Sequence, residues 1–286
     1  MKTKNFLIFP ATALALLTLA ACGSGQASKT PPSPSSSSSS SVSSSSSSTS
    51  ESSSIPESSS SSQERSTGDY SILQQLLKYT NEESPGVNKN YYLTNGDALL
   101  NGFENMAPGS FLFSSDSQGR SSTARAVLTY SDYESSKGGR QGTPLAPPGW
   151  LHDNPKVAID FSLTGKTYHG FLYNRSHSIA DSLLGKKSYT SAYNFTTGTR
   201  SQNVGANEKG GMRAAELLAE NYWKNHPGTS NTIDYMTRPV YQGEEKVPRG
   251  SIVDVKSSDG EVNQEIIVIN DAEGIKIDYM TGEMMK

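Results

Sequence analysis

The sequence that decides the fold is residues 173–182, YNRSHSIADS, which follow a strand-like run and precede residues 197–205, TGTRSQNVG. The first stretch holds His177 with Arg175 beside it, and the second holds Asn203. Hydrolysis of a phosphodiester requires a base for water, a cation for the leaving oxygen and positive charge for the phosphate. Because the two stretches can supply all three, they indicate a one-metal phosphodiesterase.

The segments around these stretches predict the order strand, strand, loop and helix. Residues 157–163 alternate apolar and polar, residues 164–166 can turn the chain, and residues 167–174 predict a second strand that ends just before His177. From residue 210 onward, apolar residues recur at helical spacing. This order would hold a histidine and an oxygen ligand near the opening of a helix, where a small cation and a phosphate can lie between them.

The chain from residue 68 to residue 286 is long enough for one domain with a hydrophobic core. It is rich in tyrosine, glycine, asparagine and serine and modest in leucine, which favours a mixed α+β domain. The periodicity predicts a short helix over residues 72–79 and an edge strand over residues 275–279. Further strands are expected at 111–113, 124–130, 231–240, 250–255 and 265–269.

The first residues predict an export signal. Lys2 and Lys4 precede an apolar run over residues 6–19, which is too short for a convincing membrane-spanning helix and is typical of a signal peptide over residues 1–21. Residues 19–23, LAACG, are similar to a bacterial lipobox, which implies cleavage before Cys22 and lipidation of its sulfur. An ordinary cleaved signal with an incidental cysteine is the alternative. Cys22 is the only cysteine, so no intrachain disulfide can form.

Residues 24–66 are mostly serine with a few prolines, so they offer almost nothing apolar to bury and are expected to be disordered. Residues 22–67, which begin with Cys22, predict a lipidated tether whose average reach is roughly 35 Å. A passive spacer between anchor and domain is the alternative interpretation, and it differs little from a tether. The expected location is the extracellular face of the bacterial cell membrane. Release of the domain from its anchor into the medium is the alternative.

Residues 174–177, NRSH, resemble the Asp-Arg-Gly-His motif of the DNA/RNA non-specific endonucleases of the ββα-metal superfamily. Together with residues 197–203 and 210–212, they are most similar to the streptodornase and DNA-entry nuclease branch of secreted bacterial nucleases. The resemblance implies a ββα-metal core within a mainly antiparallel sheet domain. It also implies a sequence-non-specific, Mg²⁺-dependent endonuclease acting on extracellular DNA, with Mn²⁺ as an alternative metal and RNA as an alternative substrate. No protein partner is inferred.

Carried over by motif, His177 is implied to be the general base, a role that suits an imidazole because it titrates near working pH. Asn203 is implied to be the sole protein ligand of Mg²⁺, which retains waters and accepts substrate oxygens. Asn194 precedes Asn203 by the interval that separates two functional asparagines in the family. It receives a supporting role, either orienting the metal shell or binding phosphate. The other histidines, His152, His169 and His226, are expected to have no catalytic task.

Arg175 and Arg200 are expected to bind phosphate oxygens, because a guanidinium can make paired contacts that lysine cannot match. On the helix that follows, the resemblance implies that a glutamate contacts the waters of the metal. Glu216 is the first candidate and Glu220 the alternative, since the spacing does not decide between them. Both glutamates are also explained as the solvated face of an amphipathic helix.

The charge of the chain, −3 at neutral pH, is unusual for a nucleic-acid binder, because phosphate contacts dominate affinity. Basic residues are frequent around the motif and acidic residues toward the C-terminus, which predicts a basic groove on an acidic body. A non-catalytic surface lipoprotein that uses the same fold for binding is the alternative function. The basic residues around the motif are Lys137, Arg140, Lys156, Lys166, Arg175, Lys186, Lys187, Arg200, Lys209 and Arg213.

Overall fold

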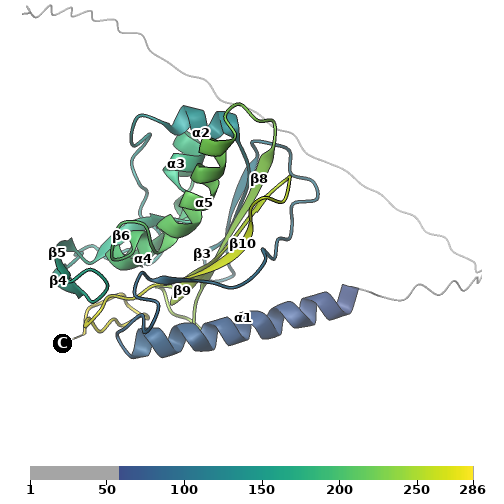
Figure 1. Ribbon diagram of the computed structural model, residues 1–286. Helices are drawn as coiled ribbons and strands as arrows, with labels where there is room; N and C mark the ends of the chain where they lie inside the picture. Colours follow the sequence, from purple (N-terminus) through teal and green to yellow (C-terminus); the bar gives the residue numbers. More distant parts are fainter. Residues whose placement is uncertain (1–57, 286) are drawn as a thin grey trace, which may run out of the picture. The chain divides into compact units, whose positions relative to one another are not determined.

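The computed structural model describes residues 58–285, with side chains from residue 68 onward (Figure 1). The predicted signal peptide, the lipidation of Cys22 and most of the serine-rich tether lie outside the described residues and stay predictions. None of the helices in the described part of the chain is both long and apolar enough to cross a membrane. Helix α1 (Ser58–Asn81) begins earlier than expected, so residues 58–67 of the predicted tether are helical.

A six-stranded antiparallel sheet forms the centre of the domain, with strand order β1-β10-β9-β8-β3-β2. Side chains alternate between its two faces, as the period of a strand requires. In β10, Ile266 and Val268 face one hydrophobic core, whereas Ile267 and Ile269 face another. The strands are β1 (Tyr92–Thr94), β2 (Phe111–Ser115), β3 (Ser121–Thr129), β8 (Thr232–Val240), β9 (Gly250–Ser257) and β10 (Asn263–Ile269).

Helices cover both faces of this sheet (Figure 1). Helix α1 packs Ile72 and Leu76 against one face. On the other face lie α5 (Met212–Asn225), α2 (Tyr130–Ser136) and α3 (Asp181–Leu184), with Trp223 of α5 buried among them. The predicted mixed α+β class, with a mainly antiparallel sheet, agrees with this arrangement.

Two small antiparallel pairs lie outside the main sheet and correct the predicted strand over residues 167–174. That segment is two strands, β5 (Lys166–Phe171), which pairs with β4 (Lys156–Phe161), and β6 (Tyr173–His177), which pairs with β7 (Phe195–Thr199). The break falls at Leu172, which is fully buried. Its N–H donates to Pro155 O, and its carbonyl accepts from Arg200 N. The strand–strand–helix order around the motif is therefore formed by β6, β7 and the helices after them.

The segment 275–279 is not the predicted edge strand. It contains only an isolated bridge between Ile277 and Met284, and Tyr279 is buried. The carbonyl of Tyr279 accepts from the N–H groups of Lys246 and Val247, and its hydroxyl donates to Asn270 O. These loop contacts satisfy the backbone without a neighbouring strand, so the apolar run here packs a core without joining a sheet.

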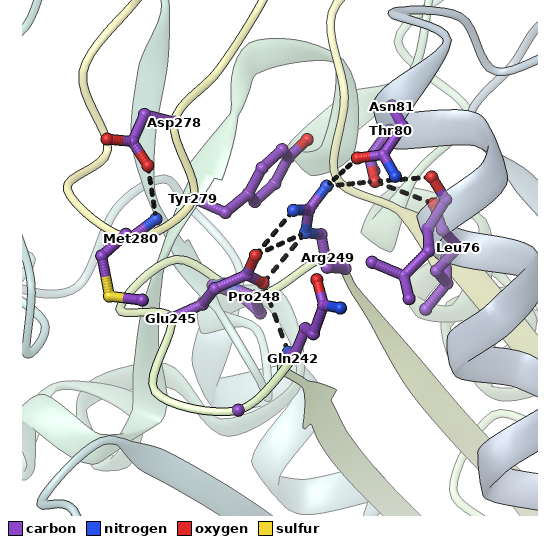
Figure 2. Close-up of polar contacts among 12 residues, drawn as sticks. Leu76, Thr80, Asn81, Gln242, Glu245, Pro248, Arg249, Asp278, Tyr279 and Met280 are labelled. Atoms are coloured by element: carbon purple, nitrogen blue, oxygen red, sulfur yellow. Dashed lines mark hydrogen bonds and ion pairs between the residues drawn. The ribbon is translucent and has the colours of Figure 1, made fainter.

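A buried arginine ties the end of α1 to this C-terminal region (Figure 2). Arg249 donates to both carboxylate oxygens of Glu245, at 2.6–3.1 Å, and to Thr80 Oγ1 and Asn81 Oδ1 at 2.8 and 2.9 Å. Its guanidinium lies 3.9 Å from the centre of the Tyr279 ring. The cluster is fully hydrogen-bonded and holds three distant segments together.

Candidate active site

His177 lies at the end of β6, opposite Phe195 of β7. Its ring is packed 4.4 Å from the ring of Phe195 and stands perpendicular to that of Tyr189 at 5.2 Å. Nε2 is buried and has no hydrogen-bond partner among the described residues. Burial, with a smaller contribution from the charge of Arg140, lowers the pKa of His177 to about 4. The imidazole is therefore neutral at physiological pH and has an uncommitted ring nitrogen.

Asn203 lies on a short helix, α4 (Arg200–Val204), where the sequence had predicted a loop. The helix forms because Thr199 caps it, since its hydroxyl oxygen accepts from Gln202 N. Thr199 is itself anchored: its N–H donates to Asn270 Oδ1, and its hydroxyl donates to Asp271 O. The half-buried Asn203 is thus positioned from the main sheet by the segment that follows β10.

Two glycines allow α4 to lie close to the start of α5. Gly211 has φ of +56°, and a Cβ there would be 2.0 Å from Gln202 O. A Cβ on Gly210 would be 2.1 Å from Asn90 O. A larger residue at Gly211 would push α4 away from the start of α5, and one at Gly210 would clash with Asn90, so the Gly-Gly pair allows the close packing of this segment.

His177 and Asn203 line the same cavity, which has a volume of about 680 Å³ and is also lined by Asn174, Arg175 and Trp150. They also share a second cavity of about 260 Å³ with Asp181 and Glu216. The structure therefore brings together four of the predicted site residues, namely His177, Asn203, Arg175 and Glu216.

The structure separates the two glutamates that the sequence left open. Glu216 lines the smaller cavity and accepts from Arg213 Nη1 at 2.9 Å. Burial raises the pKa of its carboxyl, although Arg213 opposes the shift. Glu220 lines neither cavity; it is buried, pairs with Arg213 through both carboxylate oxygens, and lies 3.5 Å from Lys224 Nζ. Glu216 is thus the glutamate at the site, and Glu220 holds Arg213 in place.

Asn194 is fully buried, which corrects the suggestion that it binds phosphate. Its amide oxygen accepts from Ile179 N, and its amide nitrogen donates to Ile179 O and Ser188 O. Ser178 N also donates to Asn194 O, directly after His177. All of these bonds hold the loop that follows the histidine, so the geometry makes Asn194 a positioning residue.

Arg200 also departs from expectation. It donates to Glu208 Oε1 at 3.1 Å, and its guanidinium lies 5.3 Å from the centre of the Tyr168 ring. It is not among the described residues that line the two cavities with His177. The structure therefore gives no support for a phosphate contact by Arg200 at the cavities of His177, although Arg200 Nη1 has no partner among the described residues.

The sequence placed Arg140 only among the basic residues near the motif, but the structure places it at both cavities with His177. Arg140 is exposed and makes no hydrogen bond or ion pair with the described residues. Trp150 is partly buried against a core and also carries Arg175 over its ring at 4.6 Å. In the sequence, Arg140 is a basic residue in a glycine-rich segment, and this pattern does not show that the segment lies beside His177.

The predicted basic groove is small and is made of arginines. Arg140 and Arg175 line the larger cavity, whereas Arg213, which lines the smaller one, is paired with Glu216 and Glu220. The nearby lysines are partly committed to carboxylates, since Lys137 pairs with Glu134 and Lys187 pairs with Asp132 at 2.6 Å. The positive charge at the cavities is therefore local, on a chain that is acidic as a whole.

Comparison with known proteins gives relatives of one kind. The chain is 32% identical over 197 residues to a deoxyribonuclease of Streptococcus dysgalactiae subsp. equisimilis, covering 59% of this chain and 58% of that protein. The chain thus spans little more than half of the length of that curated relative. No family model matches the chain.

Among solved structures, the Sda1 nuclease with a bound zinc ion is 29% identical, with a TM-score of 0.61 over 70% of this chain and 98% of that one. NucA from Streptococcus agalactiae shares the fold at 23% identity, with a TM-score of 0.54 over 74% of this chain and 95% of that one, in a structure without metal. NucA has also been solved with a magnesium ion bound. The predicted resemblance to the streptodornase and DNA-entry nuclease branch of secreted bacterial nucleases and the predicted fold class are confirmed.

Proposed function

We propose that this chain is a divalent-metal-dependent endonuclease that hydrolyses phosphodiester bonds of extracellular DNA without sequence preference. The observation that carries the proposal is the cavity shared by His177, Asn203 and Arg175. Such a cavity joins a neutral imidazole, an amide oxygen and a guanidinium, which are the groups that metal-assisted phosphodiester hydrolysis requires. The similarity to a deoxyribonuclease and to solved nucleases supports the same reaction.

In this proposal His177 is the general base. Its Nε2 lacks a partner among the described residues, so a water molecule between the histidine and the phosphate would be its natural hydrogen-bond donor. Because burial keeps the pKa of His177 near 4, the ring is in its proton-accepting form at neutral pH. Phe195 and Tyr189 pack against the ring and fix its orientation toward the water.

The residues around Asn203 fit a small hard cation. An amide oxygen is a ligand that Mg²⁺ accepts, and Glu216 places a carboxylate in the same cavity, where it can hold metal-bound waters. When bound, Mg²⁺, or Mn²⁺ in its place, would neutralise charge on the leaving oxygen. The structurally similar nucleases have been solved with zinc or with magnesium bound, which supports the use of a metal. These structures do not decide between metals, and Mg²⁺ is the metal of this proposal.

Arg175 and Arg140 are the phosphate-binding residues of the proposal. Both line the cavity, and the guanidinium group of neither is hydrogen-bonded or ion-paired with the described residues, so these donors remain available. Asn194 acts indirectly by holding the loop after His177. Lys137 and Lys187, which are paired with carboxylates, would contribute less to phosphate binding. DNA is the proposed substrate and RNA is a second candidate.

The proposed location rests mostly on residues outside the described part of the chain, since only residues 58–67 of the tether, at the start of α1, are described. A signal peptide over residues 1–21, lipidation of Cys22 and a tether over residues 22–67 would hold the domain at the outer face of the membrane. Fractionation of cells that express the chain or its Cys22→Ala variant tests this. The anchor predicts that the variant moves from the membrane fraction to the medium, and an unchanged distribution would contradict it.

A plasmid-nicking assay tests the activity. The domain from residue 58 onward, with Mg²⁺, is expected to convert supercoiled plasmid to nicked and linear forms, and a chelator should stop the reaction. His177→Ala should abolish cleavage, whereas His169→Ala, a matched change at an exposed histidine of β5 away from the cavity, should not. Intact plasmid after long incubation with well-folded wild-type protein over a range of metals and pH would refute the proposal and favour a binding module.

A further inference from the structure

A second group of metal-ligating side chains lies away from the cavity, where the end of α5 meets the turn between β9 and β10. His226 follows α5, and Asp259 and Glu261 belong to the turn. Among the residues that the structure describes, these three form the group of histidine, cysteine or carboxylate side chains whose ligand atoms all lie within 4.8 Å of one another. The sequence had assigned His226 no task.

The imidazole of His226 is oriented by its surroundings. Its Nδ1 lies 3.0 Å from Tyr222 O, and its ring stacks on that of Tyr222 with the centroids 4.4 Å apart. Because a carbonyl only accepts, Nδ1 carries a proton, and in the neutral ring Nε2 presents its lone pair to Glu261 Oε2 at 3.1 Å. Two acceptors at this distance require a proton or a cation between them. A backbone carbonyl on the second ring nitrogen is also the usual support of a metal-binding histidine.

The carboxylate of Asp259 is fixed in the same way. Its Oδ2 accepts from Tyr222 Oη at 2.6 Å and from Asn231 Nδ2 at 2.8 Å, and its Oδ1 accepts from Ser257 Oγ at 2.6 Å. A cation can replace the Asn231 contact at little cost, because Asn231 Nδ2 also donates to Tyr222 Oη at 2.8 Å. The Asn231–Asp259 contact is exposed, so the amide hydrogen that it frees can donate to solvent while the other stays on Tyr222 Oη.

We propose that His226, Asp259 and Glu261 form a zinc site that joins the end of α5 to the β9–β10 turn. One imidazole and two carboxylates match the ligand preference of Zn²⁺, and solvent can supply a fourth ligand. The partial exposure of His226 and Glu261, at 32% and 53% of their side-chain surfaces, gives the ion a path to the site. Since α5 also carries Glu216 and Arg213, the ion would stabilise the helix that lines the smaller cavity.

Zinc titration of the chelator-stripped domain tests the proposal. Calorimetry in excess Mg²⁺, which competes for the Asn203 site, is expected to show one Zn²⁺ bound per chain. Zn²⁺ at a hundredfold excess over its Kd should raise the Tm by about 5 °C. The exposed variant Glu261→Gln should weaken Zn²⁺ binding about tenfold or more, and His226→Ala should remove it. Asn203→Ala and the surface control His169→Ala should retain both the bound Zn²⁺ and the Tm gain.

Three results would overturn the proposal. Zn²⁺ binding and a Tm gain that persist in both His226→Ala and Glu261→Gln would place the ion elsewhere. Loss of the bound Zn²⁺ in Asn203→Ala alone would assign it to the active site. Absence of any Zn²⁺-induced Tm gain in the wild-type domain would reduce the group to an ion pair between a protonated His226 and Glu261. Because none of these readouts is cleavage, they are independent of the proposed nuclease activity.

Discussion

Arg249 and Arg175 each lie over an aromatic ring, but their surroundings differ. Arg249 over Tyr279 is buried, and its donors are taken by Glu245, Thr80 and Asn81 (Figure 2). Arg175 over Trp150 is exposed at the rim of the larger cavity and has no hydrogen bond or ion pair with the described residues. Arg249 therefore stabilises the fold, whereas the donors of Arg175 remain available to a ligand.

The surroundings of Arg249 and the cavity around His177 differ in the same way, in how far their polar groups are hydrogen-bonded. Around Arg249 the polar groups satisfy one another, which is what burial demands. Around His177 a buried ring nitrogen lacks a partner, and two arginines face the cavity without paired carboxylates, as far as the part of the chain with described side chains shows. Unmet hydrogen-bonding capacity in a concave, positively charged region is therefore a better guide to the site than the density of charged residues.

The largest expected effect is on cleavage by His177→Ala. Removing the general base should lower kcat by about 10²–10⁴-fold, while DNA binding measured with a chelator present stays near that of the wild type. A plasmid-cleavage time course and a fluorescence binding titration check both parts. Turnover within tenfold of the wild type would show that the unpartnered ring nitrogen is not the base.

The next effect contrasts the two arginines in stability. Arg249→Ala should lower the free energy of unfolding by about 3–5 kcal/mol, because it leaves the carboxylate of Glu245 buried without its cation. Arg175→Ala, its matched exposed counterpart, should change the same quantity by less than about 0.5 kcal/mol. Urea unfolding monitored by circular dichroism measures both. Equal losses in the two variants would remove the distinction between a structural and a ligand-facing arginine.

The buried carboxyl of Asp271 extends the comparison with His177. Like the His177 ring nitrogen, it lacks a hydrogen-bond partner among the described residues, but it does not line the cavities. Asp271 is buried, and its carboxyl oxygens find no side-chain partner among the described residues; burial raises its pKa to about 8. The folded state therefore binds a proton that the unfolded state releases between about pH 4 and pH 8. The wild-type free energy of unfolding should accordingly fall as pH rises through this window.

Asp271→Asn keeps the shape and removes the ionisation. At pH 8 the variant should be more stable than the wild type by more than about 1 kcal/mol, and the difference should shrink toward pH 4. Denaturant titrations at a series of pH values provide the measurement. A constant difference across the window would mean that Asp271 is not the titrating group.

The smallest expected effect is on DNA affinity. Arg175→Ala should raise the KM for DNA by roughly tenfold or less and reduce the slope of log K against log salt by about 0.7–0.9, as expected for one lost phosphate contact. Arg175→Lys should restore the slope but only part of the affinity, because lysine cannot bind two phosphate oxygens with fixed geometry. An unchanged salt dependence in Arg175→Ala would exclude a phosphate contact.

The sequence predicted the parts of the site that depend on local pattern. The helix expected from residue 210 onward is α5, which begins at Met212, whereas the strand expected to end just before His177 is divided into β5 and β6, and β6 includes His177. The sequence could not separate Glu216 from Glu220, because residues one turn apart share a helix face. Their roles were decided by Arg213, which Glu220 holds with both oxygens, and by the cavity that Glu216 reaches.

The errors came from long-range contacts. The break at Leu172 follows from a bond to Pro155 and from the pairing of β6 with β7, and neither is visible in a single apolar run. The run at 275–279 is apolar because it packs a core, and its carbonyls are satisfied by loop groups. The spacing left Asn194 either orienting the metal shell or binding phosphate, and its burial and backbone bonds argue against the phosphate contact.

The central claim is that His177 and Asn203 act together across a hydrated divalent ion. Mg²⁺ titrations of plasmid cleavage by the wild type, Asn203→Ala and the control Asn174→Ala test it most directly. The account predicts that Asn203→Ala needs at least about tenfold more Mg²⁺ for half-maximal activity, whereas Asn174→Ala, at the same cavity, stays near the wild type. An unchanged Mg²⁺ requirement in Asn203→Ala would contradict the account.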